Sequence, residues 1–443
     1  MIDPAQLAHL LRRTEYVARP ERMALLGPGT LDAAIDDILD FSGIDTTLPS
    51  TIDHDNPDNR WEQYVLATKW WFDRMAFDSP KPMQEKMTFF WHGHFTSAYS
   101  KVNSVWAITH QNKLYRDNAV GNFANLTQAM AIEPAMLDYL DNDDNSKGSP
   151  NQNFARELME LFTLGVGNYS EDDVIASARA WTGHGLSPWV DGSPTFRQYE
   201  FHPTNHDDTN KTFFGVTRNW NGPDIIDEIL VNNAAKKMIA ARFIVAKVWG
   251  YLAYPGPPTA VVDALAPGFA ANWNIKTMLK AMLLRSEFYA TAATQGLVRS
   301  PVDWIVAVLY YSKMRSDVLN PQWYTEGMGQ EPFDPPNVSG WKSNGYWVNT
   351  SAIGARANFA QNATYQLHKT KNYDYLAKIS TTTVDQAIDA VAGLFGLAPL
   401  SAVTRGAMTA YMNAQRAVEP WLSWAEVDNL LLMGLLAPEM HVS

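Results

Sequence analysis

The stretch from residue 151 to residue 185 constrains the fold most strongly, because it encodes two amphipathic helices separated by glycines. It reads NQNFARELMELFTLGVGNYSEDDVIASARAWTGHG. Leucine and phenylalanine recur at helical spacing from about residue 153 to residue 164, and glycines follow directly. Ser170 stands three residues before Asp173, which is the pattern of a capping box at the start of a second helix. The stretch therefore predicts a pair of packed helices.

The rest of the chain repeats this pattern with two exceptions. Helical periodicity covers most of the sequence before residue 186, between residues 224 and 288, and again after residue 352. No internal repeat or linker separates these parts. We therefore predict a mainly α protein, a large single helical domain over residues 1–443 with a small β-hairpin near residues 195–215. Long irregular insertions are expected at about residues 186–222 and 316–349.

Composition excludes several classes of function. The chain has 35 Lys and Arg against 47 Asp and Glu, a net charge of −12, which disfavours nucleic acid as a partner. No apolar run is long enough to span a membrane. The first residues lack the apolar core of a signal peptide, so the protein is either cytoplasmic or an exported protein numbered from its trimmed form. The absence of cysteine leaves His, Asp and Glu as the only strong metal ligands.

Two histidines in the motif WHGHF are the first candidates for a site. His92 and His94 are separated by Gly93 at the predicted end of a helix over residues 82–91. Residues two apart on a helix point in different directions, so both imidazoles can bind one metal only if the chain turns at Gly93. The alternative is that one histidine caps the helix and the other forms a hydrogen bond in a polar interior.

The helix at residue 153 carries a second candidate pair. Glu157 and Glu160 are three residues apart and lie beside the apolar stripe, where a carboxylate must be paired, protonated or bound to a metal. Either could act as a ligand or a general base. The structural alternative pairs Glu160 with Arg156, four residues earlier, and leaves Glu157 as the better ligand. We also expect Arg156 to be buried or half-buried against carboxylates.

The first irregular insertion supplies a third group. His206 could bind a metal with Asp207 orienting it, although the local Asn and Asp residues also suit an Asx turn. Lys211 could bind an anionic substrate or remain solvated. Tryptophans in the irregular segments could line a cleft for a sugar or aromatic ligand, or pack in the core; they are Trp181, Trp189, Trp220, Trp341 and Trp347.

Several blocks occur here in a recognisable order. They are AHLLRRT, FFWHGHFTS, EPAMLDYLDN, NQNFARELMELFTLGVGNYSEDDV, ARAWTGH, HDDTNKTFFG and PPNVSGW. Together they resemble the bacterial domain-of-unknown-function family 1800. The resemblance implies a bacterial, mainly helical protein whose relatives are often exported, and it implies no activity. Gln152 stands where that family usually has Glu, and His184 where it usually has Trp.

These observations lead to a hypothesis and one alternative. The hypothesis is a metal-dependent enzyme, an oxidoreductase ahead of a hydrolase, acting on a small molecule or glycan. His92, His94, Glu157 and His206 would hold a divalent transition metal, namely iron, copper or zinc. Glu157, Glu160 and Lys211 would be the catalytic candidates. The alternative is a non-catalytic binding or assembly module, in which the polar motifs are buried networks and Trp-rich loops bind a partner or glycan.

Overall fold

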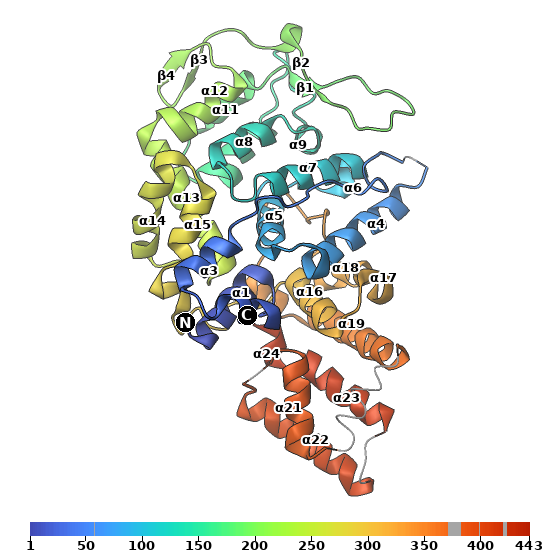
Figure 1. Cartoon of the computed structure of the whole chain (residues 1–443). Helices are drawn as coiled ribbons and strands as arrows, with labels where there is room; N and C mark the ends of the chain where they lie inside the picture. The colour runs from blue at the N-terminus through green and yellow to red at the C-terminus, as the bar shows by residue number, and fades with distance from the viewer. Residues whose placement is uncertain (57, 371–381, 398, 420–422) are drawn as a thin grey trace.

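The structure is a computed structural model that describes every residue except 57, 371–381, 398 and 420–422. Helices dominate the described residues, and the strands among them form two antiparallel two-stranded sheets, so the predicted mainly α fold is confirmed. Figure 1 shows the strands at one end of the molecule and the helices after residue 383 at the other. Within the described residues, no helix has the length and apolar character needed to cross a membrane.

The first part of the chain forms short and medium helices. In order they are α1 (Pro4–Glu15), α2 (Pro20–Leu26), α3 (Leu31–Ile38), α4 (Arg60–Asp73), the π-helix η1 (Arg74–Asp78), α5 (Pro82–His94), α6 (Tyr99–Val102), α7 (Val105–Asp117), α8 (Phe123–Ala131), α9 (Pro134–Tyr139), α10 (Asn153–Glu157), the π-helix η2 (Leu158–Thr163) and α11 (Glu171–Ala180).

The strands and the remaining helices follow. They are β1 (His184–Leu186), β2 (Tyr199–Phe201), the 3-10 helix η3 (Pro203–Asn205), β3 (Lys211–Phe213), β4 (Val216–Arg218), α12 (Gly222–Asp227), the π-helix η4 (Glu228–Asn232), α13 (Ala234–Leu252), α14 (Thr259–Asn272), α15 (Ile275–Leu283), the 3-10 helix η5 (Ser286–Tyr289), α16 (Pro301–Ser312), α17 (Ser316–Leu319), the 3-10 helix η6 (Pro321–Trp323), α18 (Thr325–Met328), the 3-10 helix η7 (Asn344–Trp347), α19 (Thr350–Lys369), α21 (Val384–Leu394), α22 (Ala402–Val418), α23 (Trp424–Leu435) and α24 (Pro438–His441).

Helix α5 lies at the centre of the molecule (Figure 1). Its residues are buried along the whole length of the helix, and only Gly93 is partly exposed. Phe90 and Trp91 belong to the hydrophobic core built with α13–α15, whereas Phe89 belongs to a second core built with α4, α16 and α19. A helix that is apolar on several faces is expected between two cores. Helix α5 therefore joins the two halves of the hydrophobic interior.

The helix pair predicted between residues 151 and 185 is confirmed. Helix α10 continues without a break into the π-helical turn η2, and Gly165 follows with a φ of 81°. The Ser170 hydroxyl accepts a hydrogen bond from the Asp173 amide, while the Asp173 carboxylate accepts one from the Ser170 amide, which completes the capping box at the start of α11.

The small β-hairpin is present, but its strands pair differently from the prediction. A single hairpin near residues 195–215 would pair β2 with β3. Instead β2 pairs with β1, and β3 pairs with β4. Phe214 and Gly215 between β3 and β4 both have positive φ, 46° and 80°, which suits the tight turn of a hairpin. The tight turn places β4 directly beside β3, so β3 pairs with β4 and not with β2.

Candidate functional site

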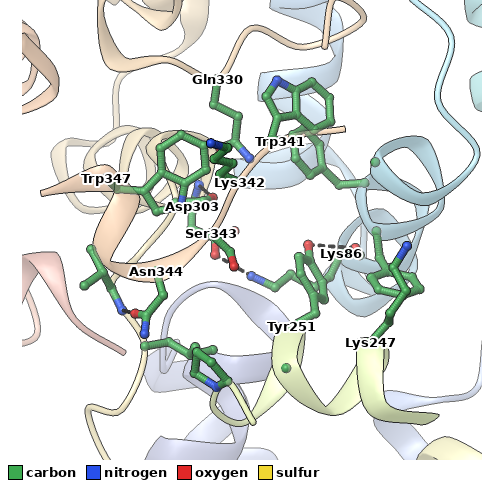
Figure 2. Close-up of a pocket in the computed structure, with 18 of the residues that line it drawn as sticks. Lys86, Lys247, Tyr251, Asp303, Gln330, Trp341, Lys342, Ser343, Asn344 and Trp347 are labelled. Carbon is green, nitrogen blue, oxygen red and sulfur yellow. Dashed lines mark hydrogen bonds and ion pairs between the residues drawn. The ribbon is translucent and has the colours of Figure 1, made fainter. Parts of the chain in front are cut away.

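A cavity of about 330 Å³ lies where the two ends of the chain meet the central helix (Figure 2). It is lined by one face of α5, one face of α13, the end of α1, residues 297–303 and the segment 330–347. We call it the central pocket. Its volume falls within the range of small-molecule sites, which run from about 300 to 1,000 Å³.

Helix α5 provides one wall through a stripe of side chains. Lys86, Phe89, Phe90, Gly93 and His94 line the pocket, and their spacing of three, four, seven and eight residues places them on one helical face. Gly93 has no side chain, which leaves room for the segment that crosses this face. The motif WHGHF thus contributes to a site, with His94 and Gly93 rather than His92 facing the cavity.

Helix α13 provides the opposite wall in the same way. Ala246, Lys247, Gly250 and Tyr251 line the pocket from one face of this helix. Two of these four residues are small, so the wall recedes and the Lys247 side chain enters the cavity. Figure 2 shows Lys247 and Tyr251 on this side, facing Trp341 and Trp347.

The second irregular insertion forms the third wall. Gly340 has a φ of 74°, and a Cβ atom there would lie 2.2 Å from the carbonyl oxygen of Gly93. Only glycine permits this approach of the loop to α5. The contact places the Trp341 ring on Phe89, with ring centroids 4.9 Å apart and planes inclined by 14°. The Trp-bearing loop predicted to line a cleft therefore does so through Trp341 and Trp347.

Positive charge dominates the pocket. Among its lining residues, all in the described part of the chain, the basic side chains are Arg12, Arg13, Lys86, Lys247 and Lys342, and Asp303 is the only Asp or Glu. Asp303 binds Lys86, with 2.6 Å between Oδ2 and Nζ. Burial lowers the pKa of Lys86, and this ion pair opposes the shift. The single carboxylate is thus already engaged.

The arginines near Asp303 have no carboxylate of their own. Neither Arg12, Arg13 nor Arg299 forms an ion pair with any described residue. Burial, with the nearby charges of Arg12 and Arg299, lowers the pKa of Arg13 to about 9 against the opposing effect of Asp303. The guanidinium stays charged at neutral pH. Buried nitrogen atoms without a hydrogen-bond acceptor remain here, namely Arg13 Nε and Arg299 Nε and Nη1.

The predicted metal ligands His92 and His94 do not share a target. Helix α5 continues through Gly93 to His94, so the two rings leave the helix in different directions. His92 packs among Trp71, Phe333 and Trp341, where burial lowers its pKa to about 3. His94 packs on the other side, and its Nε2 donates a 3.0 Å hydrogen bond to the carbonyl oxygen of Phe162.

The two predicted glutamates lie outside the pocket. Burial and the neighbouring Glu160 raise the pKa of the half-buried Glu157. Glu160 accepts a hydrogen bond from the Tyr169 hydroxyl. Arg156 does not pair with Glu160, but forms an ion pair with Glu171 at 2.7 Å, with 37% and 59% of the two side chains exposed. Arg156 is thus half-buried beside a carboxylate, as expected, but its partner is Glu171 on α11 rather than Glu160.

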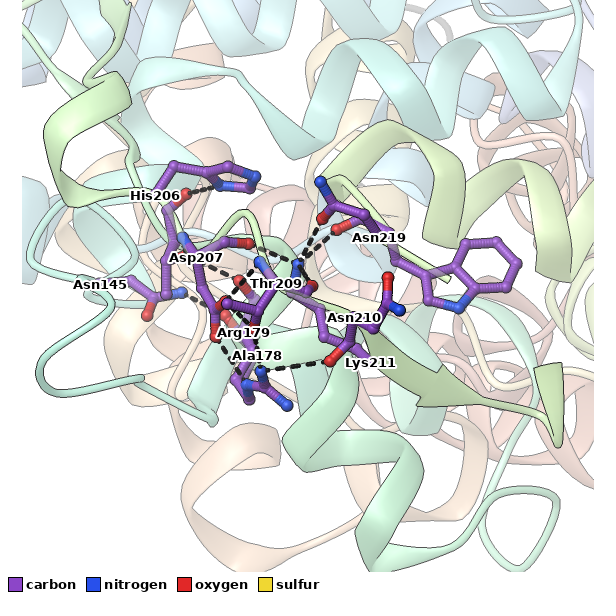
Figure 3. Close-up of polar contacts among 11 residues, drawn as sticks. Asn145, Ala178, Arg179, His206, Asp207, Thr209, Asn210, Lys211 and Asn219 are labelled. Carbon is purple, nitrogen blue, oxygen red and sulfur yellow. Dashed lines mark hydrogen bonds and ion pairs between the residues drawn. The ribbon is translucent and has the colours of Figure 1, made fainter. Parts of the chain in front are cut away.

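The third predicted group, namely His206, Asp207 and Lys211, forms hydrogen bonds and ion pairs with nearby residues (Figure 3). His206 Nδ1 donates to the Thr182 carbonyl at 2.7 Å. Asp207 forms an ion pair with Arg179 at 2.7 Å. Burial alone would raise the pKa of Asp207. Hydrogen bonds from Arg179 and Thr209 outweigh this effect, so the pKa of Asp207 is lowered. Lys211 is buried, and its Nζ contacts four oxygens: those of Asp207, Thr209 and Trp220 on the backbone and the Asn219 side chain.

These positions do not form the predicted metal centre. His92, His94, Glu157 and His206 lie in separate surroundings, and the described residues contain no group of three or more His, Asp or Glu side chains placed to hold a metal ion. No metal-binding site is therefore assembled from these four side chains in this conformation. Of the metal-binding and catalytic candidates chosen from sequence, only His94 lines the central pocket.

Sequence comparison identifies the family of the chain. Neither a curated protein nor a solved structure matched the sequence. The profile of a family described as a protein of unknown function (DUF1800) matches residues 9–442, a range that includes every wall of the central pocket described above. The chain is therefore a member of the DUF1800 family.

Proposed function

We propose that the central pocket binds a small organic anion, with a carboxylate or phosphate group beside Arg12 and Arg13 and an apolar or aromatic body against Phe90 and Trp341. The observation that carries this proposal is the set of buried arginine donors without acceptors. Oxygen atoms of an anion would satisfy Arg13 Nε, which belongs to a lining residue, while the nearby charge of Arg299 would add to the attraction.

The charge balance of the pocket supports the same conclusion. Burying a positive charge without a partner costs several kcal/mol. Here Arg12, Arg13 and Lys247 line one pocket, and Arg299 lies near the two arginines. None of the four forms an ion pair with a described residue, although the whole chain has a net charge of −12. Acidic residues are plentiful in the sequence but are placed elsewhere. A bound anion would offset the cost of this arrangement, and the walls would exclude competing water.

A structural explanation accounts for only part of the cluster. Arg356 donates to the Arg299 carbonyl at 2.8 Å and Arg13 donates to the Ala293 carbonyl and to Ser443. These bonds join the two ends of the chain. However, the Arg12 side chain has no hydrogen bond or ion pair with any described residue, and Lys247 has a single carbonyl at 3.3 Å and the Phe243 ring at 5.2 Å. The structural role therefore leaves the charges that face the cavity unexplained.

This proposal develops the binding alternative derived from the sequence. Trp341 and Trp347 come from the second irregular insertion, as expected for a ligand-binding loop. The dispersed positions of His92, His94, Glu157 and His206 give no support to the metal-dependent enzyme. Lys211, chosen from sequence as an anion-binding residue, is occupied by backbone oxygens, and the lysines of the central pocket take that role in the proposal.

The test uses probes that differ mainly in charge. Benzoate and phenyl phosphate represent the proposed ligand class, and benzamide is the uncharged counterpart of benzoate. Calorimetric titration of the full chain should show binding of one or both anions and none of benzamide. Arg12→Gln removes one charge-assisted contact, worth about 1.5–3 kcal/mol, so the affinity should fall at least about tenfold.

The control is Arg242→Gln. Arg242 lies on α13 but pairs with Asp263 on the surface, with 41% of its side chain exposed. This variant should bind the anions as the wild type does. Equal affinity for benzoate and benzamide, or equal losses in the two arginine variants, would contradict an anion site in the central pocket.

A further inference from the structure

Lys247 differs from the other lysines that line the central pocket. Lys86 is held by Asp303 and lies under the rings of Tyr16 and Tyr251, at 4.8 Å and 5.1 Å from their centroids. Lys342 is exposed and lies over the Tyr346 ring. Lys247 has no ion pair with any described residue; its Nζ donates to the Leu161 carbonyl at 3.3 Å and lies 5.2 Å from the centre of the Phe243 ring. Among these three lysines it is the one that is both partly buried and without an ion pair.

The imidazole of His94 supplies a second feature on the same side of the pocket. Its Nε2 bonds to a carbonyl oxygen, which can only accept, so Nε2 carries the proton and Nδ1 does not. His94 Nδ1 is buried and has no hydrogen-bond partner. The charge of Lys247 is close enough to act on this ring. The Lys247 side chain and a histidine with an unprotonated ring nitrogen thus line the same pocket.

We propose that Lys247 is the nucleophile of this pocket and forms an imine with an aldehyde or ketone group of the bound anion. The Lys247 amine adds to the carbonyl carbon, and one N–H proton moves to the carbonyl oxygen to give a carbinolamine. The second N–H proton passes through His94 Nδ1 to the hydroxyl, which leaves as water, and a carbon–nitrogen double bond remains. No oxidant, reductant or metal is needed. The inference rests on the proposed function, because the arginines must hold the anionic end while the carbonyl reaches α13.

The physical state of Lys247 suits this chemistry. Burial lowers the pKa of its amine to about 8. At pH 7 a roughly 300-fold larger fraction is then neutral than for a lysine with the usual value of 10.5. Only the neutral amine has the lone pair that attacks a carbonyl carbon. Desolvation of a lysine in an apolar pocket is an established way to obtain this form at neutral pH.

The experiment traps the imine by reduction. Pyridoxal 5′-phosphate, an aromatic aldehyde with a phosphate group, is added to the full chain with sodium cyanoborohydride at pH 7, and labelled peptides are mapped by mass spectrometry. Lys247 should react at least about tenfold faster than Lys236, a lysine of the same helix whose Nζ bonds to the Asn168 carbonyl at 2.6 Å. Excess benzoate should protect Lys247 and leave Lys236 unaffected.

Lys247→Met and Lys236→Met are the matched variants. The first should lose the fast, benzoate-sensitive label and the second should keep it, while circular dichroism verifies that both fold. If benzoate binds and protects but the label lies on Lys86 or Lys342, the proposed nucleophile is wrong and the anion site stands. If Lys247 labels fast and benzoate neither binds nor protects, the anion site is wrong and the reactive lysine stands. Labelling of Lys247 no faster than Lys236 overturns the inference.

Discussion

The first insertion and the central pocket each bury a lysine, and the two lysines differ in how many hydrogen-bond partners surround them. Lys211 lies among four oxygen atoms supplied by the insertion itself (Figure 3). Lys247 lies beside one distant carbonyl and faces a cavity (Figure 2). A buried polar group with all its partners in place stabilises the fold, whereas a buried charge without partners is expensive.

The difference separates a structural motif from a candidate site. The segment HDDTNKTFF is rich in residues that could do chemistry, yet its histidine, aspartate and lysine are bonded to neighbouring backbone and side-chain atoms. The central pocket leaves Arg13 Nε and His94 Nδ1 without a hydrogen-bond partner beside a cavity. The proposed ligand site rests on this unused hydrogen-bonding capacity next to a cavity rather than on the number of reactive residues.

The largest expected effect tests this comparison directly. Lys211→Met removes the donor shared by three backbone carbonyls and an amide oxygen. Leaving buried acceptors unsatisfied costs about 1–3 kcal/mol each, so we expect a loss of about 3 kcal/mol or more in the free energy of unfolding measured with urea. Lys247→Met should lose little or gain stability, because an apolar side chain replaces an unpaired charge. Similar losses in both variants would remove the distinction.

A second substitution tests the loop that forms the third wall of the pocket. Gly340→Ala places a Cβ atom 2.2 Å from the Gly93 carbonyl oxygen at a φ of 74°. The loop must move, and we expect a cost of about 2 kcal/mol in stability together with weaker benzoate binding. Gly345→Ala is the control, since a Cβ there meets no atom within 4 Å. Unchanged benzoate affinity in Gly340→Ala would show that this loop is no part of the binding site.

Comparing the pH dependence of stability between the wild type and Lys247→Met isolates the contribution of Lys247. Burial lowers its folded-state pKa to about 8, below the value of 10.5 for an ordinary lysine. The unfolded chain therefore binds more protons between these values, and stability rises with pH through this window. Lys247→Met should lack that rise, as followed by urea unfolding at a series of pH values. Parallel curves for the two proteins would mean that Lys247 has an ordinary pKa.

The smallest expected effect concerns an ion pair that is exposed to solvent. The ion pair between Arg156 and Glu171 is largely accessible to water, and exposed pairs contribute little. Arg156→Ala should melt close to the wild type in differential scanning calorimetry, and Glu171→Gln should behave in the same way. A large drop in the melting temperature would show that Arg156 stabilises the fold as a buried residue, as the sequence suggested.

Local features of the fold could be predicted because they depend on neighbouring residues. The helix at residue 153, the capping box at Ser170 and the irregular character of residues 186–222 follow from spacing and turn residues. The error at His92 and His94 came from treating Gly93 as a break. Glycine costs a helix only about 1 kcal/mol, and here α5 continues through Gly93 to His94.

The candidate site could not be predicted from local features. Its residues come from positions between 12 and 443, and the lack of a carboxylate beside Lys247 is a property of the folded molecule. Two signals were nevertheless present. Lys86, Phe89, Phe90 and Gly93 form one stripe on α5, and small residues flank Lys247 on α13. A lysine among glycine, alanine and aromatic residues on one helical face indicates a cavity more specifically than paired histidines do.

The position of the pocket also determines when it can first exist during synthesis of the chain. Val442 pairs with Val298 in a short β-bridge, and Ser443 bonds to both Leu297 and Arg13. Residues far apart in this sequence thus close the same cavity. Because residues 297–347 and 443 are synthesised after α1, α5 and α13, we expect the central pocket to be completed late in folding.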